Sequence, residues 1–384
     1  MITKGIFFKN FDIKKNSSNI KKELKFILKK NDSVIQSLGQ NYIDSFKKKL
    51  VKKYQNYMNF NLIGLGGSSL GTNAIYDYLR HKIKKNFLFI DTLQTDLKKK
   101  IEKKNLNLIV SKSGNTIETI INSHIFIKKK NKNIFITENK NNYLHSLAQI
   151  LKSEIVNHNN FIGGRYSVLS EVGMLPAELM GLESRKFRQL NNLIKNKKYL
   201  NALVKNVSAT IHLYKKKKFN SVIINYDRKS ENLFSWYQQL IAESLGKDGK
   251  GLQPIISNMP KDNHSVMQLY LDGLRNNFFT LFYVHEKNTI KIKNENILSP
   301  YKFIRNKKIG DITYAQKKAT ENIFKKRNIP FRSFEIKKRD EQTLGELFCF
   351  FILETILIAR ALKINPYNQP AVESIKKETK KILV

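Results

Sequence analysis

Short apolar runs alternate with amphipathic segments along the first half of the chain. Each run of four or five apolar residues is followed by about ten residues in which apolar positions recur every three or four. Such alternation predicts a parallel sheet covered by helices on both faces. The expected strands are 60–63, 87–90, 106–110 and 133–137, and the expected helices are 72–80, 96–103, 116–128 and 143–151.

The same alternation restarts after a long basic segment and predicts a second α/β unit. The strands expected there are 221–226, 277–284 and 331–336, and the helices are 187–217, 230–245, 313–327, 343–362 and 372–383. Two further helices, 19–29 and 34–48, are expected near the N-terminus. We therefore expect a helical lead-in (1–45), two α/β domains (46–185 and 186–365) and a C-terminal helix (366–384).

Composition agrees with two folded domains. The chain has 384 residues, of which 41% are hydrophobic and 11% aromatic, so it can bury a large core. Its net charge is +39, but 59 of the 70 basic residues are Lys, and they are scattered. Readers of nucleic acid rely on Arg for bidentate contacts. We therefore expect a solvated basic surface and no nucleic-acid partner.

The single cysteine, Cys349, excludes an intramolecular disulfide. Residues 1–15 lack the apolar centre of a signal peptide, and the most apolar stretch, 348–362, contains Glu354 and Arg360. That stretch is too short and too charged to cross a bilayer. The sequence thus predicts a soluble, cytoplasmic protein without a membrane partner.

A glycine-rich segment, Gly64-Leu65-Gly66-Gly67-Ser68-Ser69-Leu70-Gly71, stands between the first strand and its helix. Backbone N–H groups in such a loop can approach an anion, and the helix N-terminus favours negative charge. A P-loop is excluded because Thr72 and Asn73 follow Gly71. Two other interpretations of this loop stay open: a dinucleotide site, for which Asp91 is suitably spaced, and a purely structural turn.

A second junction, Ser111-Lys112-Ser113-Gly114-Asn115-Thr116, joins the strand 106–110 to the next helix. Its hydroxyls and ammonium suit a single phosphate, although Ser and Thr also cap helices. Parallel sheets bind ligands at the carboxyl ends of their strands. Two such loops in one unit therefore favour an anion site.

Three further segments carry candidate chemistry. Arg165 follows two glycines in a stretch with little other charge, which favours contact with a ligand over a surface ion pair. Glu243 is expected in the last turn of a helix among apolar neighbours, a position that disfavours negative charge and suits a general base, although an ordinary surface Glu fits too. His264 precedes a predicted helix and can exchange protons there or merely cap it. No two histidines have metal-ligand spacing with a carboxylate, so no metal is expected.

These segments together resemble the glucose-6-phosphate isomerase family. The matching pieces are 64–68, 111–116, 163–167, 239–247, 263–269 and the C-terminal Tyr367-Asn368-Gln369-Pro370-Ala371-Val372-Glu373. They occur in order from about residue 45 to the end. The resemblance implies two sugar-isomerase (SIS) domains and interconversion of glucose 6-phosphate and fructose 6-phosphate in glycolysis and gluconeogenesis, without metal or other cofactor.

The resemblance also implies roles for individual residues. It makes Glu243 the proton-shuttling base, Arg165 the cation that steadies the enediolate, and His264 and Lys376 the groups that open the sugar ring. It implies that His264 often comes from a second subunit, so a homodimer is expected. The implied substrate-binding residues are Gly67, Ser68, Ser111, Lys112, Ser113, Thr116 and Gln239.

The chain departs from the family pattern at Asn368 and Ala371, and the neighbouring Lys377 leaves the register of Lys376 open. Ser113 and Gly114 also differ from some family members. Two alternatives therefore remain: an isomerase acting on both glucose and mannose 6-phosphates, and a non-catalytic sugar-phosphate-binding regulator. A regulator need not combine Glu243, His264 and Arg165, and the presence of all three favours catalysis.

Overall fold

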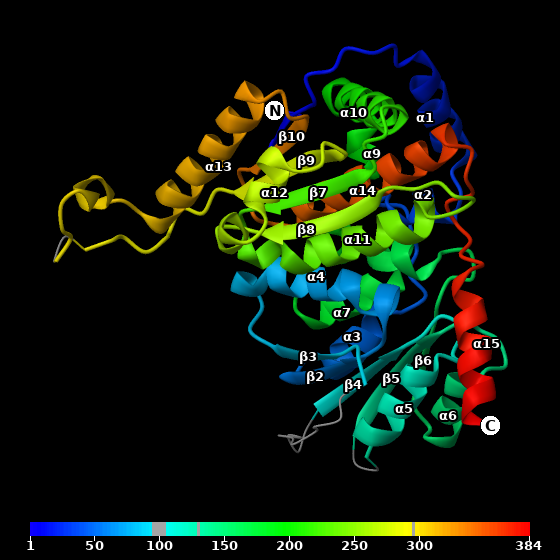
Figure 1. Cartoon of the computed structure of the whole chain (residues 1–384). Coiled ribbons are helices and arrows are strands. Elements are labelled where there is room, and N and C mark those ends of the chain that lie inside the picture. Colours follow the sequence, from blue (N-terminus) through cyan, green and yellow to red (C-terminus); the bar gives the residue numbers. More distant parts are fainter. Residues whose placement is uncertain (94–104, 129–130, 294–295) are drawn as a thin grey trace.

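The computed structural model of the chain describes residues 1–93, 105–128, 131–293 and 296–384. Two five-stranded sheets are stacked with helices between and around them (Figure 1). One is formed by residues 59–157, and the other by residues 220–336 together with residues 6–9 from the N-terminus. Both sheets are mainly parallel. The predicted fold class is therefore confirmed.

The first sheet has the strand order β3-β2-β4-β5-β6, and all of its pairs are parallel. Helices cover both faces of this sheet, so every residue of β4 is buried, and the buried amides of Asn61, Asn107 and Asn133 hydrogen-bond to one another across neighbouring strands. Helices α5 and α6 cover one face, and α4 and α7 cover the other. The bounds are β2 Asn59–Ile63, β3 Asn86–Ile90, β4 Asn105–Val110, β5 Lys132–Thr137, β6 Glu154–Asn157, α4 Leu70–Tyr78, α5 Ile117–Phe126, α6 Tyr143–Ile150 and α7 Glu171–Leu179.

The second sheet has the order β1-β10-β9-β7-β8, in which only β1 is antiparallel. Helices α10, α11 and α14 cover its inner face, and α12 and α13 pack on the outer face. The bounds are β1 Ile6–Lys9, β7 Asn220–Asn225, β8 Gln253–Asn258, β9 Asn277–Val284, β10 Phe331–Ile336, α10 Lys197–Lys215, α11 Glu231–Leu245, α12 Met267–Asp272, α13 Ile309–Lys326 and α14 Glu341–Ala361.

The largest core lies between the two sheets. It joins Leu62 and Leu108 of the first sheet to Phe282 and Phe334 of the second through buried residues of α4, α11 and α14. Helix α14, the most apolar segment, is buried from Thr343 to Ala359. In the part of the chain that the structure describes, no helix is long and apolar enough to cross a membrane.

Most predicted elements are present, but several predictions were wrong. In place of the predicted helix 34–48, the chain forms the short α2 (Ser33–Ser37), a loop and then α3 (Lys48–Tyr54). The predicted helix 187–217 is not continuous either: it is divided among the end of α8 (Ser184–Phe187), α9 (Leu190–Leu193) and α10. Strands β1, β6 and β8 and helix α7 were not predicted, whereas α12 is the helix expected after His264. The predicted helix 96–103 lies outside the described residues. Helix α1 (Ser18–Lys30) agrees with its prediction.

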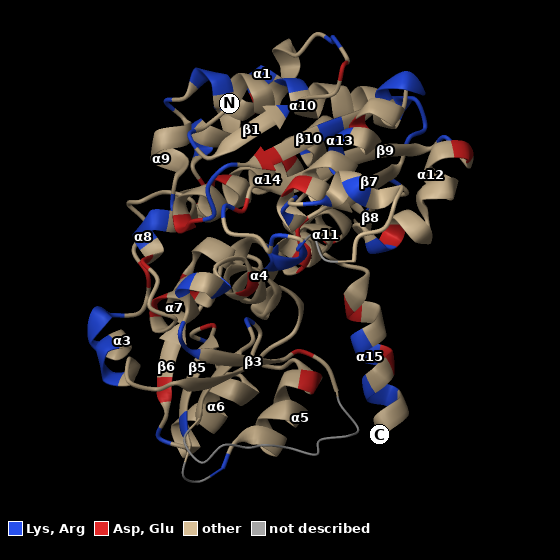
Figure 2. Cartoon of the chain, turned by 90° about the vertical axis from the view of Figure 1, so that its left-hand side faces the viewer, with Lys and Arg blue, Asp and Glu red and all other residues tan. Residues whose placement is uncertain are grey.

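The C-terminal helix α15 (Val372–Leu383) stands apart from the rest of the chain (Figure 2), and all its residues except the half-buried Val372 are exposed. Lysines and arginines are spread over separate helices, among them α3, α8 and α15, as Figure 2 shows. This scattering agrees with the solvated basic surface expected from the sequence.

Candidate active site

The site begins where the first sheet changes direction. From β2 the chain crosses to β3 on one side and then to β4 on the other, so the loops after β2 and β4 diverge. Such a switch point leaves a crevice at the carboxyl ends of the strands. Both predicted anion loops start there, and they adjoin: a Cβ on Gly64 would lie 2.8 Å from the carbonyl oxygen of Val110.

The loop after β2 contains a short 3-10 helix, η1 (Gly66–Ser68), which packs on a second one, η3 (Gly164–Leu169). Gly66 has φ +55°, and a Cβ on Gly67 would lie 2.2 Å from the carbonyl carbon of Gly164. Only glycine fits at these two positions. The glycines therefore have a packing function, which brings the half-buried Ser68 beside the Gly164-Arg165 turn.

The loop after β4 presents two paired hydroxyls. Ser111 Oγ lies 2.9 Å from Thr116 Oγ1. Thr116 is the N-cap residue of α5, but its side chain makes no capping hydrogen bond. Capping therefore does not account for this hydroxyl, which favours the anion-binding interpretation.

The other two polar groups of this loop have partners of their own. The Lys112 ammonium donates to the Asn160 carbonyl at 2.8 Å and pairs with Glu138 at 3.4 Å. Ser113 is exposed, and its hydroxyl accepts from the N–H of Asn115 at 3.3 Å. Lys112 thus has to leave Glu138 before it can contact a ligand.

Glu243 is held by two of the predicted residues. It lies in the last turn of α11, with its side chain 28% exposed, and Arg165 Nη1 contacts its Oε2 at 3.2 Å. Gln239, one turn earlier on α11, donates to the other oxygen, Oε1, at 2.8 Å. The structure therefore brings Arg165 of one motif, 163–167, against Gln239 and Glu243 of another, 239–247, and these contacts orient the carboxylate.

Arg165 is 2% exposed and uses all three of its nitrogens. Besides Glu243, it donates from Nε to Ser244 Oγ at 2.8 Å and from Nη1 to Gln369 Oε1 at 2.6 Å. Nη2 donates to the carbonyls of Pro366 at 2.6 Å and Asn368 at 3.1 Å. Burial of this cation is thus compensated by a full set of acceptors.

Residues 365–369, which we call the strap, connect α14 to α15 and supply three of those acceptors. The hydroxyl of Tyr166 also donates to the Pro366 carbonyl, at 3.1 Å. Gln369 belongs to the C-terminal motif 367–373, but no role for the strap was predicted. In the sequence, the strap is marked only by a run of polar and turn-forming residues before a terminal helix. Arg165 and Tyr166, which bind the strap, lie about 200 positions earlier in the chain.

A cavity of about 590 Å³ opens over this cluster, and its lining includes Glu243, Lys247 and Gln369. Lys247 is half-buried, and its Nζ donates to the carbonyls of Ser244 at 2.9 Å and Asn365 at 2.7 Å. Burial, with a contribution from the nearby Arg165 charge, lowers the pKa of Lys247 to about 8. The cavity thus combines a carboxylate, an amide and a cation that titrates near neutral pH.

Two predicted residues do not join this cluster within the described part of the chain. His264 is exposed at the end of the 3-10 helix η5 (Lys261–His264), after the edge strand β8. Lys376 lies on α15, where its ammonium pairs with Glu373 at 2.7 Å and both side chains are more than half exposed. Neither forms a hydrogen bond or ion pair with Glu243 or Arg165.

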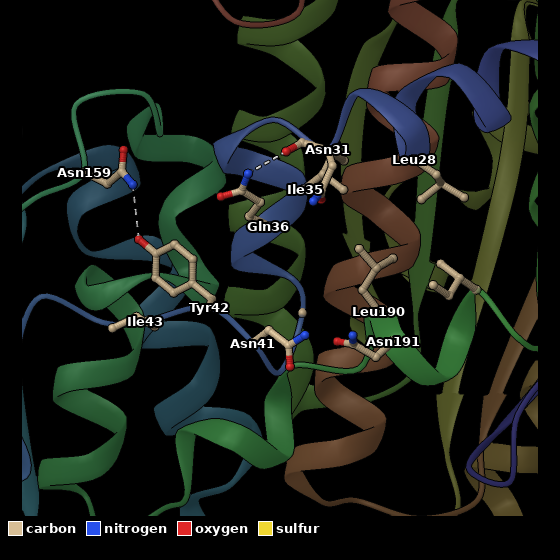
Figure 3. A pocket seen from close by; sticks show the side chains of 12 residues that line it. Leu28, Asn31, Ile35, Gln36, Asn41, Tyr42, Ile43, Asn159, Leu190 and Asn191 are labelled. Atoms are coloured by element: carbon tan, nitrogen blue, oxygen red, sulfur yellow. Dashed lines mark hydrogen bonds between the residues drawn. The ribbon is translucent and has the colours of Figure 1, made fainter.

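Another cavity of about 590 Å³ lies between α1, α2 and α9 (Figure 3). Five side-chain amides and several aliphatic side chains line it, and none of its twelve lining residues is Lys or Arg. A phosphate dianion would find no cation there. The cavity beside Glu243 is therefore the better candidate for a charged substrate.

The described ranges contain no group of three His, Cys, Asp or Glu side chains that could hold a metal ion. The chemistry available at the site is that of a carboxylate, a guanidinium, amides and hydroxyls. Such a set can move a proton and stabilise a developing oxyanion.

The paired, mainly parallel sheets have the fold of a solved tagatose-6-phosphate ketose/aldose isomerase from Escherichia coli, which superposes with a TM-score of 0.50 over 92% of this chain and 93% of that one, at 13% identity. The family model described as "Phosphoglucose isomerase" matches residues 14–260. The chain belongs to the phosphoglucose isomerase family.

Relatives agree over most of the chain. The glucose-6-phosphate isomerase of Methanocaldococcus jannaschii is 34% identical, with 85% of this chain and 84% of that protein covered. The one of Mycoplasmopsis synoviae is 31% identical, with 82% and 80% covered. Among solved structures, a glucose-6-phosphate isomerase from Chlamydia trachomatis superposes with a TM-score of 0.77 over 99% of this chain and 89% of that one, at 15% identity.

Proposed function

We propose that this chain interconverts glucose 6-phosphate and fructose 6-phosphate through a cis-enediol intermediate, with Glu243 as the base. The observation that carries the proposal is the half-buried Glu243 carboxylate, oriented by Gln239 and Arg165. Gln239 also packs against Gly66 of the first anion-suited loop, which adjoins the second. Family membership and the names of the relatives support it. A non-catalytic regulator would not need an oriented base.

In this proposal the substrate phosphate lies at the carboxyl ends of β2 and β4. Ser68, Ser111, Ser113 and Thr116 offer hydroxyls to it, and Lys112 adds positive charge once it leaves Glu138. Hydrogen bonds to an ionised phosphate are stronger than those between neutral groups. The phosphate thereby anchors one end of the sugar and places C1 and C2 near Glu243.

The chemical step is a proton transfer between neighbouring carbons. Glu243 removes the proton from C2 of the open-chain aldose, and the electron pair of that bond moves to the C1 carbonyl oxygen to give the enediolate. The same carboxyl returns the proton to C1 while a proton passes from O2 to O1, which leaves the carbonyl at C2. Negative charge develops on the substrate oxygen, and a fixed cation stabilises it. Arg165 supplies that cation by exchanging its contact with Gln369, a side chain that lines the same cavity.

Removal of one loop hydroxyl tests the phosphate assignment. In Thr116→Val, an isosteric change, KM for fructose 6-phosphate should rise by about tenfold while kcat changes little, because a hydrogen bond to a charged group contributes about 1.5–3 kcal/mol. Isomerisation is measured by coupling it to glucose 6-phosphate oxidation. Ser123→Ala, which removes a buried hydroxyl of α5 bonded to Thr119, is the control and should keep the wild-type KM. An unchanged KM in Thr116→Val contradicts the assignment.

We also propose that the chain acts as a homodimer in the cytoplasm, with His264 contributed by the partner subunit and Lys376 brought to the site on assembly. Three apolar side chains of α15, Ile375, Ile382 and Leu383, are 70%, 79% and 68% exposed, and such a face is commonly covered by a protein surface. Sedimentation equilibrium should give twice the chain mass at micromolar concentration. A fully active monomer would contradict this arrangement.

A further inference from the structure

The strap is linked to the helix that carries Glu243 by two separate routes. Arg165 and Tyr166 of η3 contact Glu243 and Ser244 of α11 and also hold the Pro366 carbonyl, and Arg165 holds Asn368 and Gln369 as well. The first residue of the strap, Asn365, is held at 2.7 Å by Lys247, which follows the end of α11. The relative position of Glu243 and Gln369 thus depends on a contact outside the Arg165 cluster.

Lys247 has the geometry of a two-sided clamp. One acceptor is the Ser244 carbonyl, in the last turn of α11, where a cation is favoured by the helix dipole. The other acceptor is the strap itself. The charged groups that act on its ammonium are Arg165, which opposes the positive charge, and Glu243 and Asp248, which favour it.

We propose that Lys247 is a positioning residue for the isomerisation: its ammonium joins the C-terminal turn of α11 to the strap and so keeps the Glu243 carboxylate and Gln369 at fixed places around Arg165. This inference rests on the proposed function, in which Glu243 is the base. Lys247 does not touch the reacting carbons, so it acts on kcat through the placement of other groups.

The test compares Lys247→Met, which keeps the length of the side chain but removes the charge, with Lys247→Arg. We expect kcat to fall about 10- to 100-fold in Lys247→Met with KM within threefold of wild type, and to stay within a few-fold in Lys247→Arg. Lys85→Met is the matched control. Lys85 also has a pKa lowered by burial, and its ammonium donates to the Gln55 carbonyl at 2.5 Å. It lies just before β3, an edge strand of the first sheet.

The pH profile adds a result that a merely structural role would not give. In the wild type, kcat should decline as the pH rises through about 8, because Lys247 then loses its proton and its charge. In Lys247→Arg this decline should move to higher pH, since the guanidinium stays charged. Thermal unfolding of each variant shows whether it is folded.

Wild-type kcat in a folded Lys247→Met, or an alkaline limb that Lys247→Arg does not move, would overturn the inference. Both results can occur while Glu243→Gln is inactive, in which case the proposed function stands without the clamp. A wild-type protein that does not isomerise fructose 6-phosphate would instead contradict the proposed function.

Discussion

Glu243→Gln is expected to lower kcat for fructose 6-phosphate about 10⁴-fold, at the upper end of what a general base contributes, because one carboxyl serves both proton transfers. KM should stay within a few-fold of wild type. The amide is isosteric with the carboxyl, and its oxygen can still accept from Arg165. Its NH2 group would face the donating Nε2 of Gln239, so Gln239 has to turn its amide to present Oε1, which has no other partner in the described part of the chain. Steady-state kinetics by the coupled assay, with circular dichroism to verify folding, measures this change.

The control for this substitution is Glu231→Gln in the first turn of the same helix. It removes a carboxylate from α11 without touching the cluster, and it should leave kcat unchanged. Activity of Glu243→Gln within tenfold of wild type would show that another group abstracts the proton.

Arg165→Lys is expected to reduce both catalysis and stability. Lysine has three donors on one nitrogen and cannot reproduce contacts made from three nitrogens in a plane, so several buried acceptors lose their partner. We expect kcat to fall about 10²- to 10³-fold through loss of the oriented cation. The free energy of unfolding should fall by about 3 kcal/mol, as when a buried ion pair is broken.

A second buried arginine separates these two effects. Arg339 is 5% exposed in its side chain and pairs with Asp227 at 2.7 Å and Glu286 at 2.8 Å, in the other half of the molecule. Arg339→Lys should also lower the urea midpoint but keep kcat for the folded protein. If Arg165→Lys behaves like Arg339→Lys, Arg165 has only a structural function.

The core strands were predictable because parallel strands buried on both faces are nearly continuous apolar runs. The strand β9 has the predicted bounds, 277–284, and every residue of it is buried. The edge strands gave no such signal: β1 has four residues, and β8 carries Pro254 at its second position. The pairing of these edge strands depends on residues far away in the sequence, so a local pattern of apolar and polar positions does not predict it.

The predicted helix 34–48 failed for a similar reason. Its spacing of apolar residues suits a helix, but the chain leaves α2 at Leu38, whose carbonyl accepts from the N–H of Leu190. A Cβ on Gly39 would lie 3.0 Å from the Asn191 side chain, so this loop is packed closely against α9. Tertiary contacts here outweigh local propensity.

The site was predictable in part. The motifs indicated Glu243, Gln239 and Arg165, and the structure adds that all three meet. The sequence did not reveal the strap or the clamp by Lys247, because these contacts join segments more than 100 positions apart through backbone carbonyls. Every residue has a backbone carbonyl, so the residue type does not indicate which carbonyl accepts a hydrogen bond, and only the fold identifies it.

The most direct test of the central claim is the conversion of fructose 6-phosphate by the purified wild-type chain in D₂O, followed by NMR. We expect part of the glucose 6-phosphate to carry deuterium at C2, because the proton held by Glu243 can exchange with solvent before it is returned. Glu243→Gln should give neither product nor label. Binding of fructose 6-phosphate without conversion by the wild-type chain would contradict the claim.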